Sequence, residues 1–121
     1  MNSKVIYELP IFSSSLSSQP KVEFVDMDIK ITLNGFDDND NIRTITLIFY
    51  SVVNYSQTSV SFCKHLYGAY DKIVEIIDSE LLKKLNLANA ESFVFWKPRH
   101  FVLFLDDIGL FEIAAQKIIV Q

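Results

Sequence analysis

Hydrophobic and polar residues alternate along much of this chain, and the alternation predicts strands. From Val22 to Leu33 the apolar residues fall at every second position, and from Ile42 to Val53 β-branched and aromatic residues dominate. Such spacing is typical of strands that place one face against a core. The polar residues of Asn34–Asn41 between these segments are typical of a turn. We therefore predict two strands that pair antiparallel through this turn.

The second half of the chain predicts a helix set among further strands. Residues 71–77 are expected to form a short strand. Ser79 is a favourable helix N-cap, Glu80 suits the first turn, and leucines at 81, 82 and 85 give a short amphipathic helix that ends near residues 86–89. Segment 54–68 is expected to be mostly loop, with a short strand near 59–63.

The C-terminal segment predicts a hairpin. Phe93–Trp96 and His100–Leu105 are expected to be strands interrupted at Pro98. The loop 106–109 ends in a glycine and leads into a last strand over residues 110–120. Together these elements predict an α+β fold: an antiparallel sheet of about five strands with one short helix.

Composition limits the domain organisation and the partners. With 121 residues the chain is expected to form one domain, 1–121, whose serine-rich first 20 residues are a loosely attached arm. Half of the residues are hydrophobic and only 21% are charged, which favours a large core, a buried homodimer surface, or both. The net charge of −4 and the scattered basic residues argue against nucleic acid as a partner.

Cellular location is also suggested by the sequence. Cys63 is the only cysteine, so neither an internal disulfide nor a cysteine-based metal cage can form, as suits a reducing cytoplasm. The first ten residues do not resemble a signal peptide, and the longest mostly apolar stretch, Ile45–Val53, is too short to span a membrane. We expect a cytoplasmic protein without a membrane partner.

Motifs that mark common enzymes do not occur in the sequence. The three glycines are isolated, which excludes a glycine-rich phosphate loop. Cys63 and His65 are spaced as a nucleophile and base on one strand face would be, but we expect Cys63 to be an inert apolar residue. The acidic residues of 37–40 lack the spacing of a calcium loop and are expected to be a solvated turn. We therefore assign no catalytic residue, no metal site and no cofactor.

A recognition surface is the site that the sequence favours. Trp96, Arg99 and His100 lie close together, and tryptophan and arginine are enriched among residues that dominate protein interfaces. We expect them to be anchors, with Asp106 and Asp107 as rim charges at the far end of the same strand. The alternative is structural: His100 bonded to a backbone carbonyl, Trp96 packed in the core, and the aspartates forming a solvated loop.

One pattern in the C-terminal half resembles a known group of proteins. It comprises residues 70–79, the leucine-rich segment 81–85, Trp96, residues 99–107 and residues 109–115. This order of elements resembles a family of small uncharacterised bacterial proteins, whose relatives resemble immunity proteins for polymorphic toxins. The resemblance implies no catalytic residues.

These observations favour a non-enzymatic protein-binding domain. The resemblance makes an immunity protein that neutralises a bacterial toxin by occlusion the concrete version of this function. The alternative is a homodimeric domain that binds a small ligand or has a structural role, with a cupped sheet lined by phenylalanines. An enzyme would require His65, His100 and a carboxylate to meet in one pocket.

Overall fold

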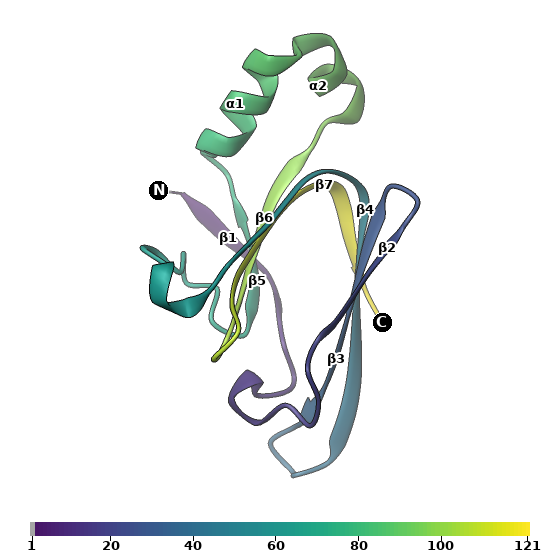
Figure 1. The fold of residues 1–121 in the computed structure, drawn as a ribbon, viewed down its shortest axis with the longest axis vertical. Helices are drawn as coiled ribbons and strands as arrows, with labels where there is room; N and C mark the ends of the chain where they lie inside the picture. Colours follow the sequence, from purple (N-terminus) through teal and green to yellow (C-terminus); the bar gives the residue numbers. More distant parts are fainter. Residues whose placement is uncertain (1) are drawn as a thin grey trace.

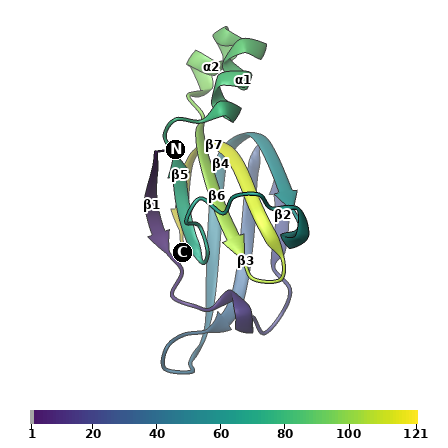
Figure 2. The same cartoon turned by 90° about the vertical axis from the view of Figure 1, so that its left-hand side faces the viewer.

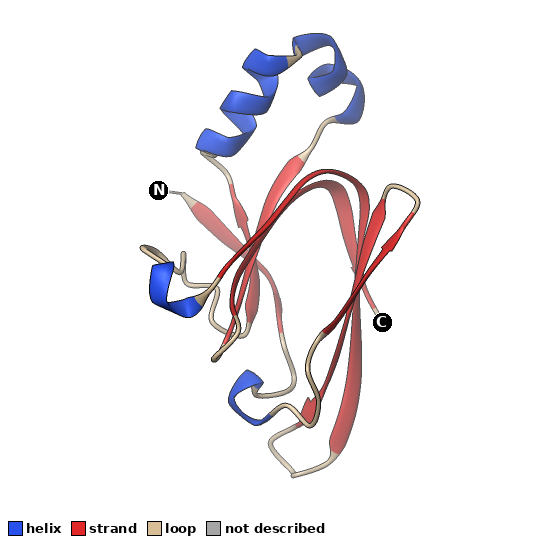
Figure 3. Ribbon diagram, in the orientation of Figure 1, coloured by secondary structure: helices blue, strands red, loops and turns tan. Residues whose placement is uncertain are grey.

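The computed structural model of the protein describes residues 2–121. Most of this chain forms strands, and two short α-helices lie at one end of the molecule (Figures 1 and 3). The strands are β1 (Ser3–Glu8), β2 (Lys21–Val25), β3 (Asp28–Phe36), β4 (Ile42–Thr58), β5 (Lys72–Ile76), β6 (Arg99–Leu105) and β7 (Gly109–Val120). The helices are α1 (Glu80–Ala88), α2 (Ala90–Trp96), and the short 3-10 helices η1 (Ser13–Ser15) and η2 (Val60–Phe62).

All seven strands belong to one sheet in the order β1-β5-β6-β7-β4-β3-β2, and every neighbouring pair is antiparallel. The α+β class with an antiparallel sheet is therefore confirmed. The expected five strands and single helix were wrong in number, because the sheet has seven strands and α2 follows α1. None of the helices in the described residues is long and apolar enough to cross a membrane.

The sheet bends over on itself where its two longest strands, β4 and β7, arch together (Figure 1). The register between them shifts between Val52 and Asn54, and Ser51 just before the shift has a positive φ of 53°. A bulge of this kind bends the strand that carries it. As a result, β3 and the first part of β4 face β5 and β6 across the core.

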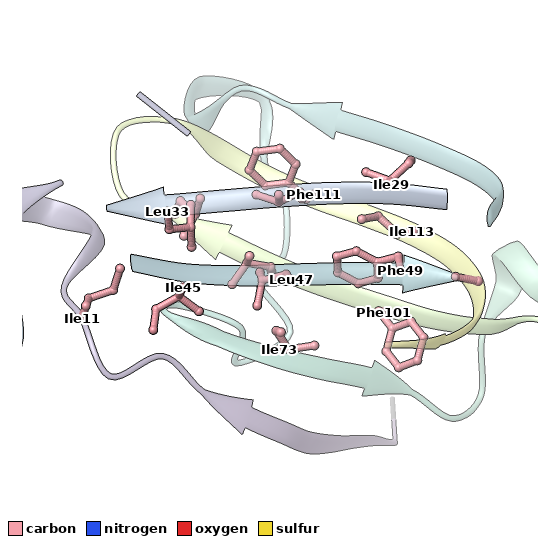
Figure 4. Close-up of a cluster of buried hydrophobic side chains, with 14 residues drawn as sticks. Ile11, Ile29, Leu33, Ile45, Leu47, Phe49, Ile73, Phe101, Phe111 and Ile113 are labelled. Atoms are coloured by element: carbon pink, nitrogen blue, oxygen red, sulfur yellow. The ribbon is translucent and has the colours of Figure 1, made fainter. Parts of the chain in front are cut away.

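Large apolar side chains fill the space between the two halves of the bent sheet (Figure 4). Phe49 of β4 and Phe101 of β6 lie with ring centroids 6.0 Å apart, and Phe111 of β7 is equally buried. These phenylalanines therefore pack with isoleucine and leucine side chains in the core of the bent sheet. A second, smaller cluster lies on the other face of the sheet and includes Val74, Val102 and Phe104.

The N-terminal segment is part of the fold, contrary to the expected loose arm. β1 is an edge strand paired with β5, and Ile11 is buried in the main core. Ser13 donates its N–H to Asp71 Oδ2 (3.2 Å), and its hydroxyl accepts a hydrogen bond from the N–H of Asp106 (2.8 Å). The serines after Pro10 suggested a linker, but Ser13 instead supplies bonds to two distant loops.

The segment Val22–Leu33 was predicted as one strand and is in fact a hairpin of β2 and β3. A two-residue turn, Asp26-Met27, separates the strands, and Asp26 has a φ of 54°. Apolar alternation continues through this turn without a glycine, so the sequence gives no sign of the reversal. Aspartate is among the residues that tolerate the left-handed conformation best.

Several predicted pairings are confirmed. β3 pairs with β4, with Leu33 opposite Ile45, and the turn between them is closed by Asp37, whose Oδ1 accepts hydrogen bonds from the N–H groups of Asn39 and Asn41. The first three residues of the expected turn, 34–36, lie within β3 instead. The third short strand and the C-terminal hairpin of β6 and β7 are also confirmed, whereas segment 59–63 contains the 3-10 helix η2 rather than a strand.

Candidate protein-binding site at the helical hairpin

The helices α1 and α2 form a hairpin that extends beyond one end of the sheet (Figure 2). Ser79 caps α1, as predicted, by accepting a hydrogen bond from the Leu82 N–H at 3.0 Å. At the end of α1, the Asn89 N–H donates a hydrogen bond to the Leu85 carbonyl oxygen. The Asn89 side chain also caps α2, because its Oδ1 accepts a hydrogen bond from the Ser92 N–H at 3.0 Å. The hairpin thus has well-defined ends, and no residue of either helix is buried.

The segment Phe93–Trp96, predicted as a strand, is the second half of α2. Its run of aromatic and β-branched residues favours a strand by propensity. The Asn89 cap decides otherwise, because it starts a new helix directly after α1. α2 ends at Lys97, whose left-handed backbone (φ 50°) turns the chain toward β6.

Three large apolar side chains of the hairpin are exposed: Leu87 (88%), Phe95 (74%) and Val94 (68%). We call these three residues the hairpin residues. Helices normally bury an apolar stripe against the body of their domain. In α2, Phe93 and Trp96 are partly buried, but Val94 and Phe95 face solvent, which is typical of a surface that another molecule covers.

An apolar cleft of about 160 Å³ lies where the hairpin meets the bend of the sheet. Its lining comprises Val53, Leu85, Ala88, Asn89, Ser92, Phe93, Trp96 and Pro98. Pockets that bind small molecules usually enclose about 300–1,000 Å³. The cleft is therefore better suited to one side chain of a partner than to a whole ligand.

The sequence-predicted residues fall into two groups. Trp96 ends α2, lines the apolar cleft and packs edge-to-face on Phe95, with ring centroids 5.3 Å apart. Trp96 is partly exposed rather than buried. Asp106 and Asp107 lie in the turn at the opposite end of β6, as predicted from the sequence. The structure therefore does not bring the two groups together.

Arg99 begins β6 and is held by an ion pair with Glu75 of β5. Its Nε and Nη2 donate to the two carboxylate oxygens at 2.9 and 2.6 Å, and the guanidinium lies 5.0 Å from the centroid of the Phe101 ring. Hydrogen bonding to the Glu75 carboxylate raises the pKa of Arg99. A variant that removes Arg99 leaves this carboxylate unpaired, so it affects more than a surface contact.

His100 joins the base of the hairpin to the sheet. Its Nδ1 lies 2.7 Å from Ser79 Oγ, and its Nε2 lies 3.1 Å from Glu112 Oε1. Ser79 Oγ also accepts the Leu82 N–H, so the hydroxyl is bonded to both the start of α1 and the His100 ring, while Nε2–H of that ring donates to the Glu112 carboxylate. The expected backbone partner of His100 is thus replaced by two side chains.

The order serine–histidine–carboxylate also occurs in hydrolases. Here Ser79 is only 3% exposed and His100 only 5%, and the hydroxyl is already bonded to both the Leu82 N–H and His100 Nδ1. The clefts beneath the hairpin and beside His65 include none of the three network residues. This arrangement anchors α1 and leaves the hydroxyl without access to a substrate.

Sequence reasoning missed Ser79 and Glu112 as partners of His100, although a signal was present. The predicted turn at 106–109 sets the register of β6 against β7, with Val102 opposite Glu112. His100 and Val102 share a face, so Glu112 is the diagonal neighbour of His100. The Ser79 cap had been recognised, but nothing local indicated which strand it would contact.

The remaining candidate residues do not form a reactive site. The Cys63 thiol lies 3.3 Å from the Ser59 carbonyl oxygen and packs against the smaller core cluster. The His65 ring lies near that of Tyr67 in a tilted arrangement, with ring centroids 6.0 Å apart. Within the described residues no hydrogen bond joins Cys63, His65 and His100, and no group of three or more histidine, cysteine or acidic residues could hold a metal ion.

No protein-family model, curated protein or solved structure matches the chain. The functional argument therefore depends on the geometry of the hairpin and of its attachment to the sheet.

Proposed function

We propose that the protein is a non-enzymatic binding domain that recognises another protein through its helical hairpin. The observation that carries this proposal is the exposure of the hairpin residues Leu87, Val94 and Phe95 on helices that bury no side chain. Large apolar side chains in such a position cost solubility unless a partner covers them.

The attachment of the hairpin supports the same function. α1 is fixed at its start by the Ser79–His100–Glu112 network, and the buried Pro98 follows α2 after the single residue Lys97. A hairpin held at both ends is ordered before binding, so less conformational entropy is lost when a partner covers it. The apolar cleft beside Trp96 offers a recess for one anchoring side chain of the partner.

The concrete form of this proposal is an immunity protein that neutralises a bacterial toxin by occlusion, in line with the resemblance of the C-terminal half. The net charge of −4 adds a modest attraction for a basic partner. Neutralisation by occlusion requires no catalytic group in the chain.

Growth rescue tests this proposal. The product of the gene directly upstream is expressed in a sensitive bacterial host, with and without this chain. We expect the product to stop growth and the chain to restore it. If the product is harmless, or if growth is not restored, the immunity function is wrong.

A matched pair of variants locates the binding surface in the same assay. Phe95→Asp places a charge on the hairpin, and Phe62→Asp makes the same change at an equally exposed phenylalanine (78%) in η2. We expect Phe95→Asp to abolish rescue and Phe62→Asp to preserve it, with both variants as stable as the native chain. Rescue by Phe95→Asp at native strength would show that the partner uses another surface.

A further inference from the structure

The two edges of the sheet differ in how well they are protected from pairing with another strand. At one edge, β1 has an irregular register between Val5 and Tyr7, and such bulges hinder the addition of a further strand. At the other edge, β2 pairs with β3 in unbroken register and has no strand on its outer side (Figure 1). β2 is therefore the edge open to pairing.

The exposed side chains of this edge are unusually apolar. Phe24 is 69% exposed, and Val25 and Met27 at the tip of the hairpin are each at least half exposed. The Phe24 ring meets Tyr55, a partly buried residue beside the core, at a centroid distance of 5.7 Å. A strand added beside β2 would cover Phe24 and the partly buried Val22.

The register of β2 shows which backbone groups are free. Val25 and Asp28 flank the two-residue turn, and residues that flank such a turn exchange hydrogen bonds. Every second residue back along β2 therefore bonds to β3, namely Glu23 and Lys21. The N–H and C=O groups of Val22 and Phe24 point away from the sheet.

We propose that β2 pairs antiparallel with β2 of a second copy of this chain, with Val22 on the two-fold axis. In this register the two Val22 residues exchange backbone hydrogen bonds, and the Phe24 N–H donates to the Pro20 carbonyl of the second copy. Lys21 then lies directly opposite Glu23 of the second copy, on the face away from the core. Opposite charges in directly facing positions stabilise a strand pair.

Charge also excludes the nearest alternative register. Moving the axis to Glu23 would place the two Glu23 carboxylates opposite each other, and like charges in that position are destabilising. It would also place Lys21 opposite Val25, without a charged partner. The facing positions of Lys21 and Glu23 therefore favour the register centred on Val22 over the one centred on Glu23.

The size of the contact sets its strength. A five-residue strand with few apolar side chains buries less than the roughly 800 Å² per partner of a stable complex. We therefore expect a dimer that dissociates in the micromolar range. This contact is independent of the helical hairpin, so Phe95→Asp should leave it unchanged.

Sedimentation velocity across the micromolar range tests the proposal with two variants. Lys21→Glu turns both facing pairs from attractive to repulsive and should weaken the dimer by about tenfold. Lys21→Glu/Glu23→Lys exchanges the charges and should restore the native dissociation constant. The Lys21 side chain is exposed and that of Glu23 is partly exposed, and their existing contact is a long one of 3.8 Å, so neither variant should prevent folding.

Each result of this experiment decides the proposal. A native chain that stays monomeric throughout the range overturns it. A dimer that Lys21→Glu leaves unchanged also overturns it, because such a dimer uses another surface or another register. Loss in the single variant together with recovery in the double variant supports both the edge and its register.

Discussion

Strand β6 and the helical hairpin are separated only by Lys97 and Pro98, yet they place their apolar side chains in opposite ways. Every residue of β6 from His100 to Leu105 is buried, whereas no residue of α1 or α2 is. The sheet therefore supplies the stability of the fold. The hairpin residues contribute little to that stability and are free to serve recognition.

The largest expected effect separates two phenylalanines that are close in sequence. Phe101→Ala removes a ring buried against Phe49 and should lower the free energy of unfolding by about 3–5 kcal/mol. Phe95→Ala on the exposed hairpin should change it by less than about 0.5 kcal/mol. Urea unfolding measures both, and similar losses would contradict the division between sheet and hairpin.

A pair of glycines sharpens the comparison within the strand-and-loop region. Gly109 has a φ of 132°, and an added Cβ would lie 2.1 Å from the Thr58 carbonyl oxygen. Gly109→Ala should therefore cost about 3 kcal/mol through strain and overlap. Gly68, with a φ of 71° and nothing within 4 Å of an added Cβ, provides the control. Gly68→Ala should cost only about 1 kcal/mol, and equal losses in thermal unfolding would argue against close packing of β4 on the β6–β7 turn.

The two helix caps are expected to differ because only one is tied to the sheet. Ser79→Ala removes a cap and leaves the buried Nδ1 of His100 without a partner, for an expected loss of about 2–3 kcal/mol. Asn89→Ala removes only an exposed cap and should cost about 1 kcal/mol. Equal losses in urea unfolding would show that the His100 network does not anchor the hairpin.

The smallest effect concerns the ion pair at the start of β6. A double-mutant cycle of Arg99→Ala and Glu75→Ala should give a coupling of about 1 kcal/mol, because the pair is bidentate but partly exposed. A coupling near zero would mean that the pair adds nothing to the sheet. In that event any loss of binding in Arg99→Ala could be assigned to recognition alone.

Predictions from sequence succeeded where one physical signal acted alone. Alternation in β3 and β4 led directly to their pairing, since one face of each strand is buried. The Ser79 cap likewise marked the start of α1. One failure arose where no local signal existed, at the turn between β2 and β3, and another where signals competed. Aromatic propensity in Phe93–Trp96 suggested a strand, but the Asn89 cap started a helix.

Only part of the candidate site could be predicted from the sequence. Trp96 and Arg99 lie at the junction of hairpin and sheet, but the exposed residues Leu87 and Phe95 went unnoticed. Their exposure depends on how the hairpin is oriented, and the sequence does not specify that orientation. The Ser79–His100–Glu112 network required the register of two strands and the position of a helix end together.

Hydrogen–deuterium exchange in the presence of the upstream gene product tests the central claim most directly. We expect added protection to be confined to residues 80–97 and their junction with β6, and to disappear in Phe95→Asp. Exchange in the buried strand β6 itself should be slow with or without the partner. Protection elsewhere on the surface, with the hairpin unchanged, would contradict the assignment of the hairpin as the binding site.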